Sequence, residues 1–151
     1  MKRIAILLTL AAFMATPAIC FADNPHMGTW TLNEAKSKFG PGATKNRTVV
    51  YEQSGDDVKV TVDGTDGAGN AIHSEWTGKF DGKPYDVTGD PTSDKRAYTK
   101  VNDHKLTFTA TSGGKKTLTG VVTVSADGKT RTVVTKTPDG KGGATAVYDK
   151  Q

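Results

Sequence analysis

Apolar and polar residues alternate along most of this chain, and this period of two constrains its fold more than any other feature. Val58, Val60 and Val62 alternate with polar residues, and Leu106, Phe108 and Ala110 alternate with threonines. Because successive side chains of a β-strand point to opposite faces, such runs predict strands with one buried and one solvated face. That pattern is typical of antiparallel sheets.

Short clusters of turn residues separate these runs. Asp-Gly and Gly-Gly pairs, among them Asp81-Gly82 and Gly113-Gly114, recur between the runs and supply the positive φ that tight hairpins require. Asn33 is suited to cap one short helical turn near 33–39. The intervals between the turns predict about nine or ten strands, at 28–32, 47–53, 58–63, 71–80, 84–88, 95–101, 105–111, 115–125, 130–137 and 144–149.

So many sequential hairpins in a chain of this length predict an all-β fold. We expect an antiparallel up-and-down meander, closed into a lipocalin-like barrel of about 8–10 strands, since closure removes exposed strand edges. A two-sheet sandwich is the alternative. Residues 23–151 are expected to form this single barrel domain.

The first 22 residues have the composition of a secretory signal peptide. Lys2 and Arg3 precede the apolar run 4–14, and small residues permit cleavage after Ala22. We therefore expect an exported protein, periplasmic or extracellular, with no stable membrane insertion after processing, because the run is too short to span a bilayer. Lipid attachment at Cys20 is the rival interpretation, although Ile19 is a poor residue for the preceding position.

Cleavage after Ala22 would remove the one cysteine of the chain and leave no thiol for disulfide or redox chemistry. The formal net charge of the whole chain is +4, and Lys2 and Arg3 of the leader contribute two of these positive charges. The remaining basic residues are expected along the outer faces of the strands, dispersed among nearly as many acidic ones, so no nucleic-acid partner is expected. We expect a monomer.

Metal binding and catalysis find little support in the sequence. His26, His73 and His104 fall in the N-terminal tail, on an outward strand face and in a turn, so no metal site is predicted. The loop 63–70 has glycines where a calcium loop needs side-chain oxygens. No carboxylate pair and no Gly-x-Ser-x-Gly motif is present. The prediction is a protein that is not an enzyme and has no cofactor.

Both ends of the predicted meander carry a family resemblance. The first strand reads Gly28-Thr29-Trp30-Thr31-Leu32 and the last ends Ala146-Val147-Tyr148-Asp149-Lys150. In these ends the chain resembles the calycins, which comprise lipocalins and intracellular fatty-acid-binding proteins. The resemblance implies that Trp30 fills the barrel floor and that the last strand pairs with the first. The chain lacks a two-helix lid, and Ala146 stands where the fatty-acid-binding proteins place a carboxylate-binding arginine, so their mode of binding is not expected.

Three further segments, spread along nearly the whole chain after the leader, carry a second resemblance. They are Gly28 to Phe39, Phe80 to Lys83 with Tyr85, and Val124 to Thr130. In these segments the chain is similar to a group of small secreted bacterial proteins described as lipocalin-like. This resemblance implies the barrel and brings no activity with it.

The leading functional hypothesis is a secreted, non-catalytic binding protein for a small apolar or amphipathic molecule. Ser74, Gly78 and Gly120 are small inner residues and are expected to leave room in the lumen. The alternative is an envelope or extracellular interaction protein with a side-chain-filled barrel and no ligand. The inward-facing candidates for ligand contact combine apolar bodies with phenol groups: Tyr51, Val60, Trp76, Tyr85 and Phe108.

Overall fold

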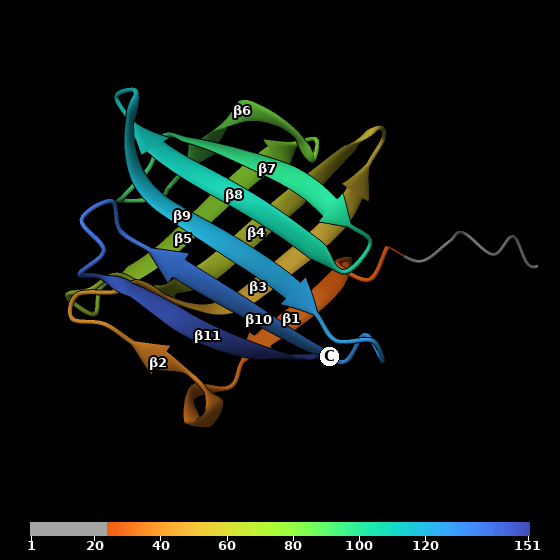
Figure 1. Cartoon of the computed structure of the whole chain (residues 1–151), viewed down its shortest axis with the longest axis horizontal. Helices are drawn as coiled ribbons and strands as arrows, with labels where there is room; N and C mark the ends of the chain where they lie inside the picture. Colours follow the sequence, from red (N-terminus) through yellow and green to blue (C-terminus); the bar gives the residue numbers. More distant parts are fainter. Residues whose placement is uncertain (1–23) are drawn as a thin grey trace, which may run out of the picture.

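The computed structural model describes residues 24–151, so the predicted leader lies outside the described residues. Eleven strands form one continuous antiparallel sheet (Figure 1). Their bounds are β1 Gly28–Leu32, β2 Lys38–Phe39, β3 Lys45–Ser54, β4 Asp57–Thr65, β5 Ala71–Gly78, β6 Asp81–Thr88, β7 Lys95–Asn102, β8 Lys105–Ser112, β9 Lys115–Val124, β10 Thr130–Lys136 and β11 Gly143–Lys150.

The sheet closes on itself because β1 pairs on both of its edges. Trp30 lies opposite Val49 of β3 and opposite Lys150 of β11. From β3 to β11 each strand pairs with the next in sequence, so ten of the eleven strands form the closed wall and β2 extends one edge. The predicted up-and-down barrel is confirmed. The sandwich alternative is wrong, since the sheet is never divided in two.

The first-to-last seam is built from two short pieces of chain. After β1, a single 3-10 turn over Glu34–Lys36 bulges outward, and the Asn33 side chain accepts a hydrogen bond from the Lys36 amide. The chain then returns to β11 as β2 (Figure 1). The helical turn predicted near 33–39 is therefore confirmed at its start, but Lys38 and Phe39 are a strand, because β11 offers them free edge groups.

A second correction concerns the region between β5 and β6. The strand predicted at 71–80 ends at Gly78, and the next strand begins at Asp81 instead of residue 84. The pair Asp81-Gly82, predicted to form a turn, lies inside β6, where the register with β7 shifts. Gly82 has φ +81°, which provides the left-handed residue that such a bulge needs.

The inner face of the barrel carries the apolar half of the alternating pattern. Trp30 and Trp76 are both buried, as the sequence predicts. Burial of the valines and aromatic rings on this face supplies the main stabilisation of the barrel. The buried apolar residues are Trp30, Val49, Tyr51, Val58, Val60, Val62, Trp76, Val87, Tyr98, Leu106, Phe108, Ala110, Val122, Val124, Ala146 and Tyr148.

The two ends of the barrel differ. At the closed end, on the right in Figure 1, the segment 24–27 covers the floor and lies next to the C-terminus. At the opposite end, the mouth, the segment 40–44 joins β2 to β3. Within residues 24–151, no helix is long and apolar enough to cross a membrane.

Candidate ligand-binding site

Aromatic side chains fill the half of the barrel next to the closed end. Trp76 stacks on Phe80 with ring centroids 6.2 Å apart, and Tyr98 meets Trp76 edge-to-face with ring centroids 4.9 Å apart. Tyr85 meets Trp76 edge-on at 5.8 Å, and Phe108 contacts Tyr98 at 5.4 Å. Such offset and edge-to-face contacts are favourable pair geometries. This half of the lumen is a packed core.

The structure brings together the side chains predicted to contact a ligand, but it places them in this core. Tyr51, Val60, Trp76 and Phe108 are buried, and Tyr85 is half-buried with its hydroxyl donating to Asp81 at 2.9 Å. Their part in binding stays a prediction. None of the five lines either of the two pockets described below.

Of the small inner residues expected to leave room, Ser74 lines a small pocket, whereas Gly78 and Gly120 do not leave space. A Cβ atom on Gly120 would lie 2.2 Å from the Phe108 ring, and one on Gly78 would lie 2.4 Å from the Tyr85 ring. Each glycine is therefore covered by an aromatic ring from the facing or neighbouring strand. For these two glycines the expectation was wrong, because the aromatic ring of a neighbouring residue fills the volume that a ligand would need.

Space remains at the mouth. A pocket of about 170 Å³ lies beneath the segment 41–44. Its walls are mainly small or apolar, including Leu118 of β9 and Ala144 of β11, with threonine hydroxyls between them. Sequence reasoning missed this pocket, because nothing in the Pro41-Gly42-Ala43-Thr44 segment indicates that it folds over the barrel instead of into solvent.

A smaller polar pocket of about 40 Å³ adjoins the first, since Thr44 and Thr92 line both. One wall holds an ion pair in which Arg96 Nη2 lies 2.6 Å from Asp90 Oδ2, and both side chains are largely buried. Ser74 and Asn46 also line it. Arg96 Nε is buried without a hydrogen-bond partner among the described residues. We call the two pockets together the mouth site.

Asp90 is held in position by its own loop. Its carboxylate accepts hydrogen bonds from the hydroxyls of Thr92 and Ser93, each at 2.7 Å. Although burial opposes ionisation, Arg96 and these hydroxyls lower the pKa of Asp90 below its usual value. The ion pair is therefore charged at neutral pH and presents a fixed dipole to the mouth site.

A second buried arginine lies deeper in the barrel. Arg131 of β10 is 4% exposed, and its Nη2 donates to the Tyr51 hydroxyl at 2.8 Å. Its guanidinium carbon lies 4.6 Å from the Tyr51 ring centroid and 5.5 Å from that of Tyr148. No carboxylate within residues 24–151 lies within 4.0 Å of it, so aromatic faces stabilise this cation in place of a counter-ion.

Each buried arginine contacts a tyrosine hydroxyl: Arg96 Nη1 lies 3.5 Å from that of Tyr98, and Arg131 Nη2 lies 2.8 Å from that of Tyr51. Burial raises the pKa of Tyr51, whereas the Arg96 guanidinium lowers the pKa of Tyr98 in spite of burial. Burial also raises the pKa of Tyr148 to about 12. Sequence reasoning assigned the basic residues to outer faces, which is wrong for Arg96 and Arg131. Their positions in the alternating pattern, in phase with Tyr98 and Val133, were the available signal.

The floor of the barrel holds a third unexpected residue. His26, predicted to lie in a free tail, is 2% exposed, and neither ring nitrogen has a hydrogen-bond partner among the described residues. Its carbonyl oxygen accepts from Trp30 Nε1 at 2.9 Å, which secures the segment beneath the barrel. Burial first, and then the nearby cations, lower the pKa of His26 to about 4.

Other chemistry is sparse in the described part of the chain. Within residues 24–151, no group of three metal-ligating side chains is close enough to hold an ion. The exposed His73 lies 2.6 Å from Asp63 and 3.7 Å from Glu75, and Asp63 raises the pKa of this imidazole. These three side chains lie on the outer surface, away from both pockets of the mouth site.

In comparisons with known proteins, the chain matches no family model and no curated protein. Among solved structures it is similar to two redesigned β-barrels, mFAP1 and mFAP0, each bound to DFHBI. The first is 19% identical with a TM-score of 0.44, covering 83% of this chain and 95% of that one. The second is 16% identical with a TM-score of 0.46, covering 83% of this chain and 99% of that one.

Proposed function

We propose that this protein is a non-catalytic binding protein that takes one small apolar or amphipathic molecule into the mouth site. The observation that supports the proposal is the joining of an apolar pocket to a polar one. An apolar body would rest against Leu118 and Ala144, and a polar group would point toward Arg96 and Asp90. A few fixed polar groups in a mainly apolar pocket are typical of ligand sites.

The size of the mouth site limits the ligand. Its larger pocket is about 170 Å³, whereas sites for drug-sized ligands are commonly about 300–1,000 Å³. We therefore propose a molecule of roughly one or two rings, or a short chain, in place of a long lipid. The packed core below leaves such a ligand close to the surface.

The experiment is a fluorescence titration with 2-naphthol, a small neutral aromatic probe, on the purified protein. The proposal predicts a single saturable site. Ala144→Leu should weaken binding about tenfold or more by filling the pocket, with no loss of folded protein. Ala71→Leu makes the same change at an exposed position on β5 and should leave binding unchanged. Unsaturable binding, or equal loss in both variants, would contradict the proposal.

A second candidate function has an observation in its favour. The packing of Phe108 over Gly120 and of Tyr85 over Gly78 fills the closed half, as expected for an interaction protein that binds no ligand. That protein would act through its surface or hairpin tips. Absence of any probe binding, together with native mass spectra free of a co-purified small molecule, would favour this candidate.

Export is the remaining part of the proposal and rests on the leader sequence. If residues 1–22 are removed, the intact mass of secreted material should correspond to a chain that begins at Asp23. A retained leader, or a lipid attached to Cys20, would contradict this proposal and favour a membrane-anchored protein.

A further inference from the structure

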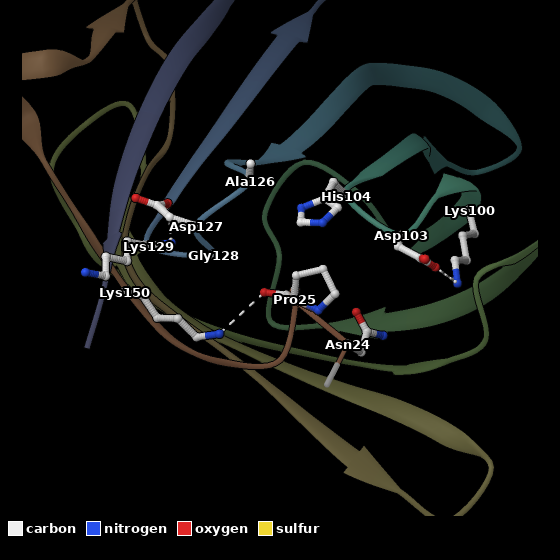
Figure 2. Close-up of a pocket in the computed structure, with 10 residues that line it drawn as sticks. All are labelled: Asn24, Pro25, Lys100, Asp103, His104, Ala126, Asp127, Gly128, Lys129 and Lys150. Atoms are coloured by element: carbon white, nitrogen blue, oxygen red, sulfur yellow. Dashed lines mark hydrogen bonds and ion pairs between the residues drawn. The ribbon is translucent and has the colours of Figure 1, made fainter. Parts of the chain in front are cut away.

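The closed end carries a second hollow, far from the mouth site. It is an open cleft of about 610 Å³, which we call the closed-end cleft (Figure 2). Four separate parts of the chain form its walls: Asn24 with Pro25, the turn between β7 and β8, residues 126–129 between β9 and β10, and Lys150 of β11. A cleft of this size on the outside of a barrel is not explained by packing of the lumen.

The charges around the closed-end cleft do not balance. Its lining includes Lys100, Lys129 and Lys150 but only two carboxylates. Asp103 pairs with Lys100 at 2.7 Å. Asp127 accepts hydrogen bonds within its own turn, from the Ser125 hydroxyl at 2.6 Å and the Lys129 amide at 3.0 Å.

Two ammonium groups are therefore left without a counter-ion. Among the described residues, no carboxylate lies within 4.0 Å of Lys129 Nζ or Lys150 Nζ. Lys150 Nζ lies 5.1 Å from the Trp30 ring centroid and 3.5 Å from the Pro25 carbonyl oxygen. Figure 2 shows this ammonium directed toward Pro25, on the inner side of the cleft. Its position is thus fixed by the floor of the barrel, whereas Lys129 stands on the rim.

His104 also lines the cleft. Its Nδ1 lies 3.2 Å from the Val124 carbonyl oxygen, so Nδ1 carries the hydrogen and donates. The hydrogen bond fixes the orientation of the ring, which lies on the wall opposite Lys150 in Figure 2.

His26, buried in the floor of the barrel, lies close enough to these basic side chains for their charges to affect its pKa. After burial, the charges of Arg131, Lys100 and Lys150 and the nearby His104 lower the pKa of His26. The basic side chains of the cleft therefore contribute positive potential at this end of the molecule. A concave surface with one sign of potential attracts ligands of the opposite charge.

We propose that the closed-end cleft is a binding site for a small molecule that carries a multiply charged oxyanion, held between Lys150, His104 and Lys129. Ammonium groups bind phosphate as point charges, and the His104 ring lies in the wall of the same cleft. Free phosphate and an organic phosphate ester share this chemistry. The proposal is independent of the mouth site, because the two lie at opposite ends of the barrel.

The experiment is an NMR titration of the histidine ring resonances at constant ionic strength, with inorganic phosphate as the probe. The expected result is a saturable shift of the His104 resonances and no comparable shift for His73, which is exposed on the outer wall of β5. A parallel titration with glycerol 2-phosphate distinguishes the two sources. Tighter binding of the ester indicates an organic phosphate, and equal binding indicates the free anion.

Lysine variants distinguish phosphate binding in the closed-end cleft from a general effect of the protein's positive charge. Lys129→Gln should weaken phosphate binding about fivefold or more, and Lys150→Gln should do the same. Lys116→Gln removes the same charge from an exposed position at the mouth and should leave binding unchanged. Because Lys150 packs on Trp30, Lys129→Gln is the decisive variant if Lys150→Gln fails to fold. A linear, unsaturable shift, or equal weakening by Lys116→Gln, would overturn the proposal.

Discussion

At the scale of single residues, the barrel is organised around a few buried polar side chains in an apolar lumen. Trp30 illustrates how sequence and packing act together. It is fully buried, its Nε1 donates to the His26 carbonyl oxygen at 2.9 Å, and its ring lies 6.0 Å from the Arg131 guanidinium and 5.1 Å from the Lys150 ammonium. This one side chain therefore joins the floor segment, the seam and the buried arginine.

Trp30→Ala is expected to lower the free energy of unfolding by about 3–5 kcal/mol, the usual cost of truncating a buried tryptophan. Trp30→Phe keeps an aromatic ring but loses the hydrogen bond to His26, so it should cost less. Chemical denaturation at neutral pH measures both values. A midpoint for Trp30→Ala close to that of the unchanged protein would show that the floor contributes little to stability.

Removing the hydroxyl of Tyr51 should lower the free energy of unfolding, because the buried guanidinium of Arg131 then lacks a hydrogen-bond acceptor. Tyr51→Phe keeps the ring beneath the guanidinium but takes away the acceptor of the 2.8 Å hydrogen bond. Because a buried charged donor loses its partner, we expect a loss of about 1–3 kcal/mol in unfolding free energy. Tyr148→Phe is the matched control, since its ring also faces Arg131 but no hydrogen bond joins its hydroxyl to that residue. Equal losses in the two variants would refute this assignment.

At the scale of the strands, glycines and aromatic rings are paired across the sheet. Gly120 of β9 lies opposite Phe108 of β8, and the Phe108 ring occupies the volume where a side chain on Gly120 would stand. The alternating pattern places both residues on the inner face but says nothing of which one fills the space. The pairing explains why a strand interior tolerates a glycine here.

Gly120→Ala should therefore destabilise the protein by about 1–3 kcal/mol through overpacking. The double variant Gly120→Ala/Phe108→Leu should recover part of that loss, because the smaller side chain makes room for the new methyl group. The double-mutant cycle, measured by thermal or chemical unfolding, gives the coupling energy between the two sites. Additive effects of the two changes would mean that the ring does not respond to Gly120.

At the scale of the whole molecule, the closed end links stability to pH. His26 is neutral in its buried site, with a pKa of about 4 in place of its ordinary 6.5. The unfolded chain therefore binds a proton that the folded chain does not bind between these two values. Stability is full above pH 6.5 and falls as the pH drops toward about 4.

The size of this effect follows from the shift in pKa. We expect a loss of up to about 3 kcal/mol in unfolding free energy, with about one proton taken up on unfolding, as the pH falls through this window. His26→Phe should flatten the dependence between pH 7 and 5. His73→Gln, which alters an exposed histidine whose pKa is raised, should retain it. A pH profile unchanged by His26→Phe would show that His26 is not its source.

The sequence by itself determined the class of fold and the strands. Alternation in period two depends only on local backbone geometry, so it correctly predicted the ten strands of the barrel wall, the turns between most of them and the burial of both tryptophans. The resemblance to the calycins implied that the last strand pairs with the first, and β11 does pair with β1. The strands and their buried faces are encoded by neighbours in sequence, because a strand's two faces are fixed along its own length.

The tertiary structure alone decided where space and charge lie inside the barrel. Whether Gly120 leaves a void depends on Phe108, whether Arg131 is tolerated depends on rings from three other strands, and whether His26 is free depends on the floor it covers. The mouth site likewise exists only because the segment 41–44 folds back over distant strands. Packing of side chains across the sheet is a non-local property, and a pattern read along one strand carries no information about the volume of the residues that face it.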